Sequence, residues 1–474
     1  MFTKKQIELQ KIEDKKSIMN LWNKLEYDLA SKSTTEDAKQ IRLAFEDCYK
    51  DMFGTGDLIE WAANLYDPVI GGFYYSNSAR DNDGFLPDIE STKQAMEWLL
   101  YFSTKDELGN EIKSFYPEWM KKQVIKFLKE RQDENGYFYH PQWDKAFTDT
   151  KHNRRGRDLD WACSLLLQMD EAPTYDTPNG VRGNGLLWDG TPVSNYIRSE
   201  KKDDPTPVKE AFVTPHLKDK QSFIEYLGKF DLNGASYSTG NTLESQATQI
   251  FMRDAQLKEA GIDYSLCETL KEWFDKHQNK QNGLWTLGEN ITRSGINGLL
   301  KISGTYNRVK QPIPNPELGI ASAIKIIEED SNVATVCDVL NPWYALSVLT
   351  SNIKNYHNAD ESESGKKAKD AMQYIFAHSP EMISATKNLI MQFKKPDGSF
   401  SYCKTHSSMY SQKHIVAVAD TNEGDVNATI IGSAAVVGHI FHLLGADRIP
   451  AFTTADKMRL LNILEKRNEE TKRQ

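Results

Sequence analysis

One unit, clearest over residues 395–444, recurs along this chain and constrains its fold more than any other feature. A tight turn containing glycine leads into a short aromatic run, a polar loop follows, and an apolar helix then begins at an acidic residue. In this stretch the turn is Asp397-Gly398, the aromatic run ends at Tyr402, and the helix opens at Asp425. Asp-Gly permits the positive φ of a hairpin-type turn, and an aspartate at a helix start satisfies free N–H groups. Repetition of the unit predicts an array whose members bury their apolar faces only against one another.

The turns and helix openings can be located along the whole chain. The turn recurs at Gly71-Gly72, Asn135-Gly136, Asn233-Gly234, Asn282-Gly283 and Asp397-Gly398. Helix openings are expected at Asp88, Asp158, Thr242, Arg293, Asp338 and Asp425. Strand signals are limited to the short aromatic runs after each glycine. We therefore expect an all-α protein, an (α/α)6 toroid with short β-hairpin-like Gly-aromatic turns, in which an outer ring of helices wraps an inner ring.

The pattern also predicts how the chain is divided. Residues 57–445 are expected to form the toroid, with outer helices in residues 1–56 and a C-terminal helix with a charged tail in residues 446–474. Residues 171–215 are rich in Pro, Gly, Asp and Asn and are expected to form a loop insertion. An ordered loop of this length is usually functional.

Composition excludes several classes of protein. The net charge of -9 argues against a general nucleic-acid binder, which would show a basic patch. A mean hydropathy of -0.60, the lack of an eighteen-residue apolar run and a charged N-terminus without an apolar core predict no membrane span and a cytoplasmic location. The five cysteines are scattered with no C-x-x-C pair, so we expect reduced thiols, no structural metal and no cofactor. The oligomeric state is left open.

The segment Asp397–Phe400, its polar loop and the helix EGDVNATIIGSAAVVGHI of residues 423–440 together resemble a known repeat. It is that of the terpenoid cyclase and protein prenyltransferase β-subunit toroid family. Units of that family run Gly-Gly-Phe or Gly-Ser-Phe, then a loop, then an inner helix opened by Asp-Val. The similarity extends over most of residues 60–445 as a periodic pattern. It implies the toroid fold.

The catalytic motifs of that family are absent here. Its cyclases use an Asp-x-Asp-Asp acid, which neither Asp81-Asn82-Asp83-Gly84 nor Asp158-Leu159-Asp160-Trp161 completes. A diphosphate-dependent enzyme needs Asp-Asp-x-x-Asp to carry magnesium, yet the pair Asp203-Asp204 continues as Pro-Thr-Pro. Protein prenylation uses a zinc held by Asp, Cys and His, and no cysteine follows Asp425. The resemblance therefore implies a fold and not a reaction.

The expected helix openings lie at the same end of their helices, so in a toroid they converge on one mouth of the central cavity. Three acidic residues, Glu90, Asp160 and Glu244, each lie two positions after an expected helix opening, and Asp425 is itself such an opening. An acidic residue there is most often only a cap, but one cap per helix suffices. The catalytic candidates are Glu90, Asp160, Glu244 and Asp425.

Aromatic, cationic and histidine side chains near the same mouth are the candidates for binding substrate. They are Tyr75, His140, Trp143, Arg157, Trp285, Arg293, Tyr306 and His406. Acidic groups beside stacking aromatics suit a sugar, which presents flat C–H faces and many hydroxyls. Two carboxyls about 5 to 10 Å apart would suffice for glycoside hydrolysis. A lyase would need a base near a sugar C5 proton and a group that neutralises a uronate, for which Lys301 and Tyr306 are candidates.

These observations favour a carbohydrate-active enzyme, a glycoside hydrolase or a lyase, whose partner is an oligosaccharide or another small ligand. A sugar epimerase belongs to the same fold neighbourhood. The alternative is a toroid that binds a glycan, peptide or small ligand without catalysis. An atypical relative of the terpenoid cyclases or prenyltransferases is a weaker alternative.

Overall fold

The computed structural model describes residues 1–150, 152–177, 181–196, 215–357 and 363–473, and most of these are helical. Strands are confined, in this part of the chain, to two short antiparallel hairpins. The prediction of an all-α protein is confirmed. The Asp203-Asp204 pair and part of the expected insertion at residues 171–215 lie outside the described residues.

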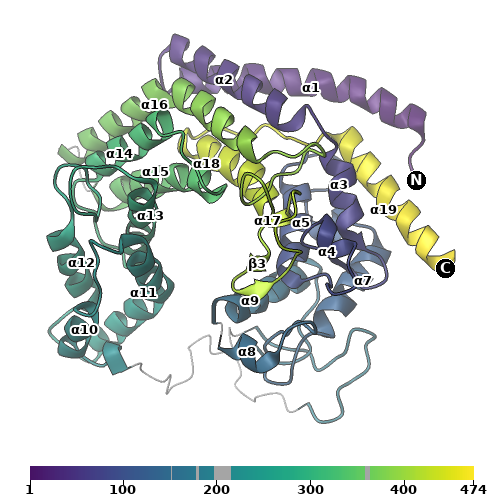
Figure 1. Cartoon of the computed structure of the whole chain (residues 1–474), viewed down its shortest axis with the longest axis horizontal. Helices are drawn as coiled ribbons and strands as arrows, with labels where there is room; N and C mark the ends of the chain where they lie inside the picture. The colour runs from purple at the N-terminus through teal and green to yellow at the C-terminus, as the bar shows by residue number, and fades with distance from the viewer. Residues whose placement is uncertain (151, 178–180, 197–214, 358–362, 474) are drawn as a thin grey trace.

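An inner row of helices lines the concave side of an arc (Figure 1). Its order in space is α9, α5, α17 with α18, α15, α13 and α11, and each member packs against the next. α17, a π-helical turn and α18 follow one another without a break and form one continuous helix from Val426 to Leu443. The bounds are α5 Ile89–Tyr101, α9 His152–Gln168, α11 Ser236–Glu259, α13 Arg293–Arg308, α15 Cys337–Tyr356, α17 Val426–Ile430, the π-helical turn Ile431–Ala435 and α18 Val436–Leu443.

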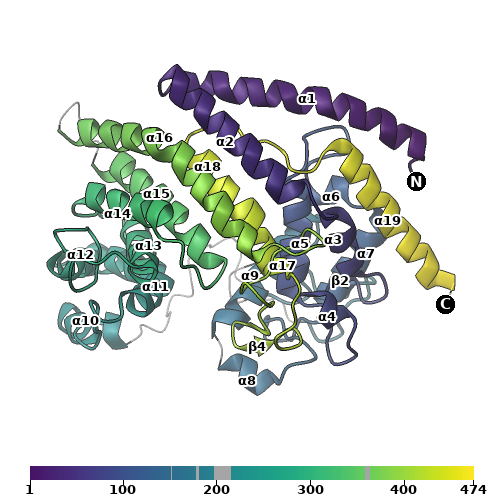
Figure 2. The same cartoon turned by 45° about the horizontal axis from the view of Figure 1, so that its top comes forward.

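A second row covers the convex side of this arc. α7 packs against α9, α12 against α11, α14 and α16 against α15, and α2 against α16. α1 lies outside this row against α2 and α19, as Figure 2 shows. The bounds are α1 Lys4–Ala30, α2 Thr35–Phe53, α3 Leu58–Leu65, α4 Asn77–Arg80, α6 Ile112–Phe115, α7 Glu118–Lys129, α8 Lys145–Asp149, α10 Lys220–Leu227, α12 Leu266–His277, α14 Pro316–Glu329, α16 Glu363–Ile390 and α19 Thr454–Arg473.

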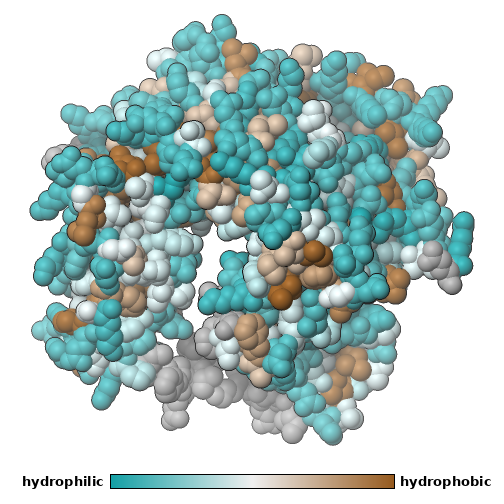
Figure 3. Space-filling view, in the orientation of Figure 1, coloured by the Kyte–Doolittle hydropathy of each residue, from teal (hydrophilic) through white to brown (hydrophobic). Residues whose placement is uncertain are grey.

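The arc has two hydrophobic cores. One extends from α1 and α2 through α10–α16 to α18, and the other joins α3–α9 to α19 and the start of α17. The two halves border an open space, flanked by α11 and α13 on one side and by α9 on the other (Figures 1 and 3). Side chains at its visible rim are mainly hydrophilic or neutral in hydropathy. Polar groups of the inner helices therefore face this space.

The Gly-aromatic turns form largely as predicted. Gly71, Gly136, Gly283 and Gly398 all have positive φ, and the first of them lies in the hairpin of β1 (Tyr66–Asp67) and β2 (Gly72–Phe73). The expectation fails at Gly234, whose φ is not positive and which leads directly into α11. β3 (Tyr410–Ser411) pairs with β4 (His414–Ile415) in the loop before α17.

Several predicted helix openings are confirmed and two are wrong. Asp88 and Asp425 cap α5 and α17, and α13 begins at Arg293. Asp158 lies inside α9, because an i,i+4 ion pair with Arg154 extends the helix toward its N-terminus. Thr242 lies inside α11, whose first turns pack tightly on α13. α15 begins one residue before Asp338.

One segment among the described residues, Val426–Leu443, is long and apolar enough to cross a membrane. However, 61% of it is buried inside the protein. A core helix has the same properties, so this segment gives no clear evidence of a membrane span.

Candidate functional site

The acidic caps Asp88 and Asp425 are tied to the aromatic turns that precede them. The backbone N–H of Asp88 donates to the carbonyl of Phe73 at 3.3 Å, and that of Asp425 donates to the carbonyl of Phe400 at 2.9 Å. The N–H of Phe400 in turn donates to the hydroxyl of Thr429, one turn into α17, at 3.0 Å. Each turn is thus held against the helix that follows it, and this determines where the cap lies.

A fully buried arginine, Arg154 of α9, joins three carboxyl groups. Its Nε donates to both oxygens of Asp158 at 3.1 and 3.0 Å, its Nη1 to Glu90 at 2.8 Å and its Nη2 to Asp88 at 2.9 Å. None of these three carboxyl side chains is more than 3% exposed. A planar guanidinium can satisfy several carboxylates at once, whereas a lysine could not with this geometry. The cluster therefore locks the N-terminal parts of α5 and α9 together.

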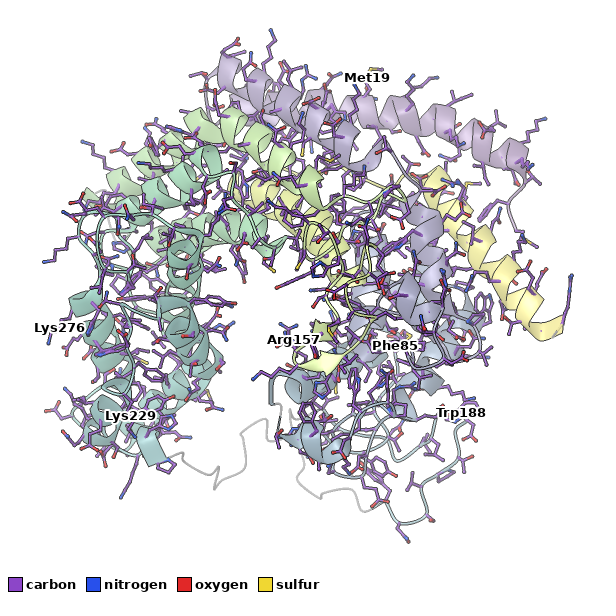
Figure 4. All side chains as sticks on the ribbon, in the orientation of Figure 1. Met19, Phe85, Arg157, Trp188, Lys229 and Lys276 are labelled. Carbon is purple, nitrogen blue, oxygen red and sulfur yellow. The ribbon has the colours of Figure 1, made fainter. Side chains whose placement is uncertain are left out.

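Glu90 is bonded on both of its oxygens. Besides Arg154, its Oε2 accepts from the hydroxyl of Ser411 at 2.7 Å, and its Oε1 accepts from Nη1 of Arg157 at 3.0 Å. The side chain of Arg157 is 42% exposed, whereas that of Glu90 is 1% exposed. Figure 4 shows Arg157 at the edge of the open space between the two halves. The group that this cluster presents to solvent is therefore Arg157.

The cluster holds three carboxyl groups but only two arginines, so one carboxyl lacks a counter-charge. Burial raises the pKa of Asp158 to about 7, despite the opposing effect of Arg154. Burial alone would lower the pKa of Arg154, but the surrounding carboxylates hold it above its usual value. The arginine thus stays charged, and a proton on Asp158 balances the cluster at mildly acidic pH.

Asp425 lies beside this cluster and is also fully buried. Its Oδ1 accepts from the N–H of Ala428 at 2.7 Å and its Oδ2 from the N–H of Tyr402 at 3.1 Å. The hydroxyl of Tyr75 is a further hydrogen-bond partner. Burial raises the pKa of Asp425 to about 7 and outweighs these hydrogen bonds, which lower it. Burial also raises the pKa of Tyr75, and the charges of Asp425 and then Glu90 raise it further.

Aromatic rings cover the buried arginine. The guanidinium carbon of Arg154 lies 4.5 Å from the ring centre of Trp143. That ring lies 4.3 Å from the ring of His140 and 4.6 Å from the ring of His414. Burial lowers the pKa of His140 to about 4, so its imidazole is neutral at pH 7. Its Nε2 lies 2.9 Å from the carbonyl of Pro87, to which it donates in this neutral form.

The loop of residues 403–424, which carries β3 and β4, closes over the cluster. Ser411 of β3 reaches Glu90, and Nε1 of Trp143 donates to the carbonyl of Ile415 in β4 at 3.0 Å. The loop therefore shields the carboxyl groups from solvent.

The structure gathers half of the predicted site residues in this region. The residues it brings together are Tyr75, Glu90, His140, Trp143, Arg157 and Asp425. Glu90 was expected to be a catalytic acid. It is buried, and its two oxygens accept hydrogen bonds from two arginines, so its contacts in this structure hold the helices together.

Glu244 and Arg293 belong to the opposite half. Glu244 accepts from Lys301 at 2.8 Å, across the contact of α11 with α13. Nη1 of Arg293 donates to the carbonyl of Asp338 at 2.7 Å, across the contact of α13 with α15. Both residues connect neighbouring inner helices. Glu244 lies well inside α11, contrary to its expected place in a first turn.

Two residues predicted to bind substrate, Trp285 and Tyr306, lie in the hydrophobic core. Trp285 and Tyr306 are fully buried, with Nε1 of Trp285 donating to the carbonyl of Phe274 at 2.8 Å and the hydroxyl of Tyr306 donating to Asp275 at 2.5 Å. Both point toward the outer helix α12 and pack in the core. Tyr306 therefore lies too deep to serve a lyase.

Asp160 and His406 lie outside the cluster as well. Asp160 is exposed on α9, beyond the first turn in which it was expected. Nδ1 of His406 lies 2.9 Å from the hydroxyl of Thr405 in the polar loop.

Arg154, Ser411 and His414 are not among the site residues predicted from the sequence. Arg154 and Asp158 are four residues apart, a spacing that brings opposite charges together on a helix and was a usable signal. Ser411 and His414 had no such signal, because their partners are distant in sequence.

Within the described ranges, no group of three or more His, Cys, Asp or Glu side chains is placed to hold a metal. All five cysteines are free thiols. No family model, curated protein or solved structure matches this chain.

Proposed function

We propose that this chain is a cytoplasmic carbohydrate-active enzyme, a glycoside hydrolase or lyase that cleaves an acidic oligosaccharide on an (α/α)6 toroid. The toroid is supported by the two rows of helices, with the ring open between α9 and α11. The substrate would enter the open space and meet the N-terminal ends of the inner helices.

The observation that carries the proposal is the environment of Arg157. Its guanidinium is partly exposed at the open space and is held from behind by the buried Glu90. An arginine held this way suits the carboxylate of a uronate sugar, which it can bind through two parallel hydrogen bonds. Burial raises the pKa of the Cys337 thiol to about 11, and among the smaller effects Asp425 raises it and Arg157 lowers it.

Polar contacts between the inner helices support a sugar as the ligand. Nδ2 of Asn341 donates to Asn297 at 2.8 Å between α15 and α13, and Nε2 of Gln94 donates to Asn427 at 3.1 Å between α5 and α17. In this proposal the remaining donors and acceptors of these amides bind sugar hydroxyls.

In this proposal Arg157 binds the substrate carboxylate, and Asp425 with Tyr75 transfers the proton. A pKa of about 7 suits a general acid or base at neutral pH. Because the loop of residues 403–424 covers Asp425, it has to move for the substrate to reach the carboxyl group. The hydrogen bond of Ser411 to Glu90 is one of the contacts that this movement breaks.

Binding of an acidic glycan without catalysis is the second candidate. The pairing of both oxygens of Glu90 and the burial of Asp158 favour it, because a carboxyl that is fully engaged cannot attack a substrate. Arg157 would recognise the ligand in the same way.

The test is a cleavage assay on matched neutral and uronate-containing oligosaccharides. New reducing ends report cleavage of either kind, and ultraviolet absorbance of a new C4–C5 double bond reports a lyase. We expect cleavage of the acidic substrates and a loss of about tenfold or more in kcat/KM for Arg157→Gln, the effect of losing a charge-assisted hydrogen bond. Arg155→Gln is the matched control, since Arg155 lies on the same helix and pairs with Asp149.

Asp425→Asn separates catalysis from binding. It should lower kcat by about a hundredfold or more if Asp425 transfers the proton. Binding of uronate oligosaccharides by calorimetry, without cleavage by the wild-type protein, would support the second candidate. A protein that neither binds nor cleaves acidic glycans would refute both.

A further inference from the structure

Two adjoining cavities lie along α18, the smaller one beside the π-helical turn that precedes this helix and the larger one at its C-terminal end. Their volumes are about 540 and 430 Å³, and His442 lines both. On this helix the residues lining the cavities run from Ala434 to Leu443, which at 1.5 Å per residue is about 14 to 27 Å along the axis from Asp425. They form a region separate from the candidate site and independent of the proposed function.

The smaller cavity contains an arginine without a carboxylate partner. The guanidinium carbon of Arg448 lies 3.4 Å above the ring of Tyr101 and 5.0 Å from the ring of Phe102. Its Nη2 contacts the Tyr101 hydroxyl, while its Nη1 is buried and has no hydrogen-bond partner. Burial lowers the pKa of Arg448 to about 10, and among the described residues no carboxylate forms an ion pair with it. The side chain as a whole is half-buried, so an anion in this cavity would meet both an accessible charge and an N–H without a partner.

Histidines flank this arginine. His439 and His442 of α18 line the same cavity, and the ring of His439 stacks on Tyr344 of α15 with 4.3 Å between centroids. Burial lowers the pKa of His439 to about 4, so its imidazole is neutral at pH 7. Attraction to the negative end of the helix dipole would explain the presence of the Arg448 guanidinium here. It does not explain a buried N–H without a partner or a cavity beside it.

The larger cavity is also lined by positively charged side chains. Lys354 and Lys369 line it together with the hydroxyl of Ser351. Among the residues that the structure describes, Asp447 is the one acidic residue lining either cavity, and its carboxylate pairs with Lys24 at 2.7 Å. This concentration of cations occurs in a chain whose net charge is -9. Composition therefore does not account for it.

The helix wall of the smaller cavity is unusual. Ala434 and Ala435 line it from the π-helical turn, and such turns occur frequently at functional sites. The next wall residue is Gly438, where an added Cβ would lie 3.7 Å from Nη2 of Arg448. Small residues thus keep the space in front of the guanidinium open.

We propose that these cavities bind a small phosphate ester, with the phosphate against Arg448 and the histidines and the rest of the molecule in the larger cavity. A guanidinium with two flanking imidazoles offers several hydrogen-bond donors, whereas a carboxylate has only two oxygens to accept from them. A phosphate monoester has three strong acceptor oxygens and matches them better.

Calorimetric titration of the full chain tests the proposal. The probes are inorganic phosphate and glycerol 3-phosphate, compared with acetate at equal ionic strength. We expect saturable binding of both phosphates, tighter for the ester, and much weaker binding of acetate. Vesicles of phosphatidylcholine with and without phosphatidic acid form a second arm, and binding to the acidic vesicles alone would assign the phosphate to a lipid headgroup. No saturable binding in either arm overturns the proposal.

Variants locate the bound phosphate. Arg448→Gln should weaken phosphate binding about ten- to hundredfold. If that variant does not fold, His442→Asn and Lys369→Gln test the same cavities from exposed positions. Lys366→Gln is the matched control, because Lys366 is exposed on the same helix as Lys369 and is not among the residues lining the cavity. Equal affinities for the wild type, the cavity variants and the control would place any bound phosphate elsewhere and overturn the proposal.

Discussion

Replacing Arg154 by methionine tests how the buried cluster holds the two helices together. Methionine roughly preserves the volume of the side chain but removes the donors to Asp88, Glu90 and Asp158. Glu90 keeps its bond to Arg157, whereas the other two carboxyl groups lose their cation. Removing one partner of a buried ion pair costs about 3 to 5 kcal/mol, because the remaining charge stays buried without compensation.

That loss is large compared with a total stability of about 5 to 15 kcal/mol for a typical domain. Arg157→Met is the matched control, since Arg157 bonds the same Glu90 from the same helix but is 42% exposed. Partly exposed pairs contribute about 0 to 1 kcal/mol, so the control should lose little. Comparing the two variants thus distinguishes the stability lost with a buried ion pair from the stability lost when any arginine of this helix is replaced.

Urea denaturation at pH 7, followed by circular dichroism, measures both effects. We expect the midpoint of Arg154→Met to fall well below those of the wild type and of Arg157→Met. Equal losses in the two variants, or a gain in stability for Arg154→Met, would refute the conclusion that Arg154 compensates the buried carboxylates.

Two further predictions concern a proton and a turn. Burial raises the pKa of Asp425 from its ordinary value of 3.8 to about 7, so the folded state holds this proton more tightly than the unfolded state. Stability should therefore fall as pH rises from about 4 to about 7, on the order of 1 kcal/mol per pH unit. Asp425→Asn should remove that part of the slope in urea denaturation across this range, and an unchanged slope would contradict the raised pKa. Gly56→Ala should cost more than about 2 kcal/mol, because the added Cβ would lie 2.2 Å from the backbone nitrogen of Gly398 in addition to the strain of a φ of +79°. Gly190→Ala, with φ +82° and open space around its Cβ, should cost only about 1 kcal/mol in the same assay, and equal losses would contradict the close approach.

Local features of this chain could be predicted from neighbouring residues. The positive φ at Gly398 and the caps at Asp88 and Asp425 depend on residues within a few positions, where turn chemistry and helix N–H groups decide the conformation. The helix opening expected at Asp158 was wrong because a side-chain pair one turn away competes with the local signal.

The roles of the site residues could not be predicted in the same way. Whether Glu90 is a free acid or an ion-paired anchor depends on Arg154, 64 positions away, and on Ser411, 321 positions away. Tyr306 carries a polar group like Tyr75 does, yet one lies in the core against α12 and the other lies beside Asp425.

The sequence by itself therefore determined the helical class, most of the turns and the acidic caps, because each depends on the backbone preferences of adjacent residues. Only the tertiary structure decided which carboxyl groups are buried, which arginines compensate them and which cation faces the open space. Burial and charge pairing depend on the distances between segments that the chain brings together only when it folds.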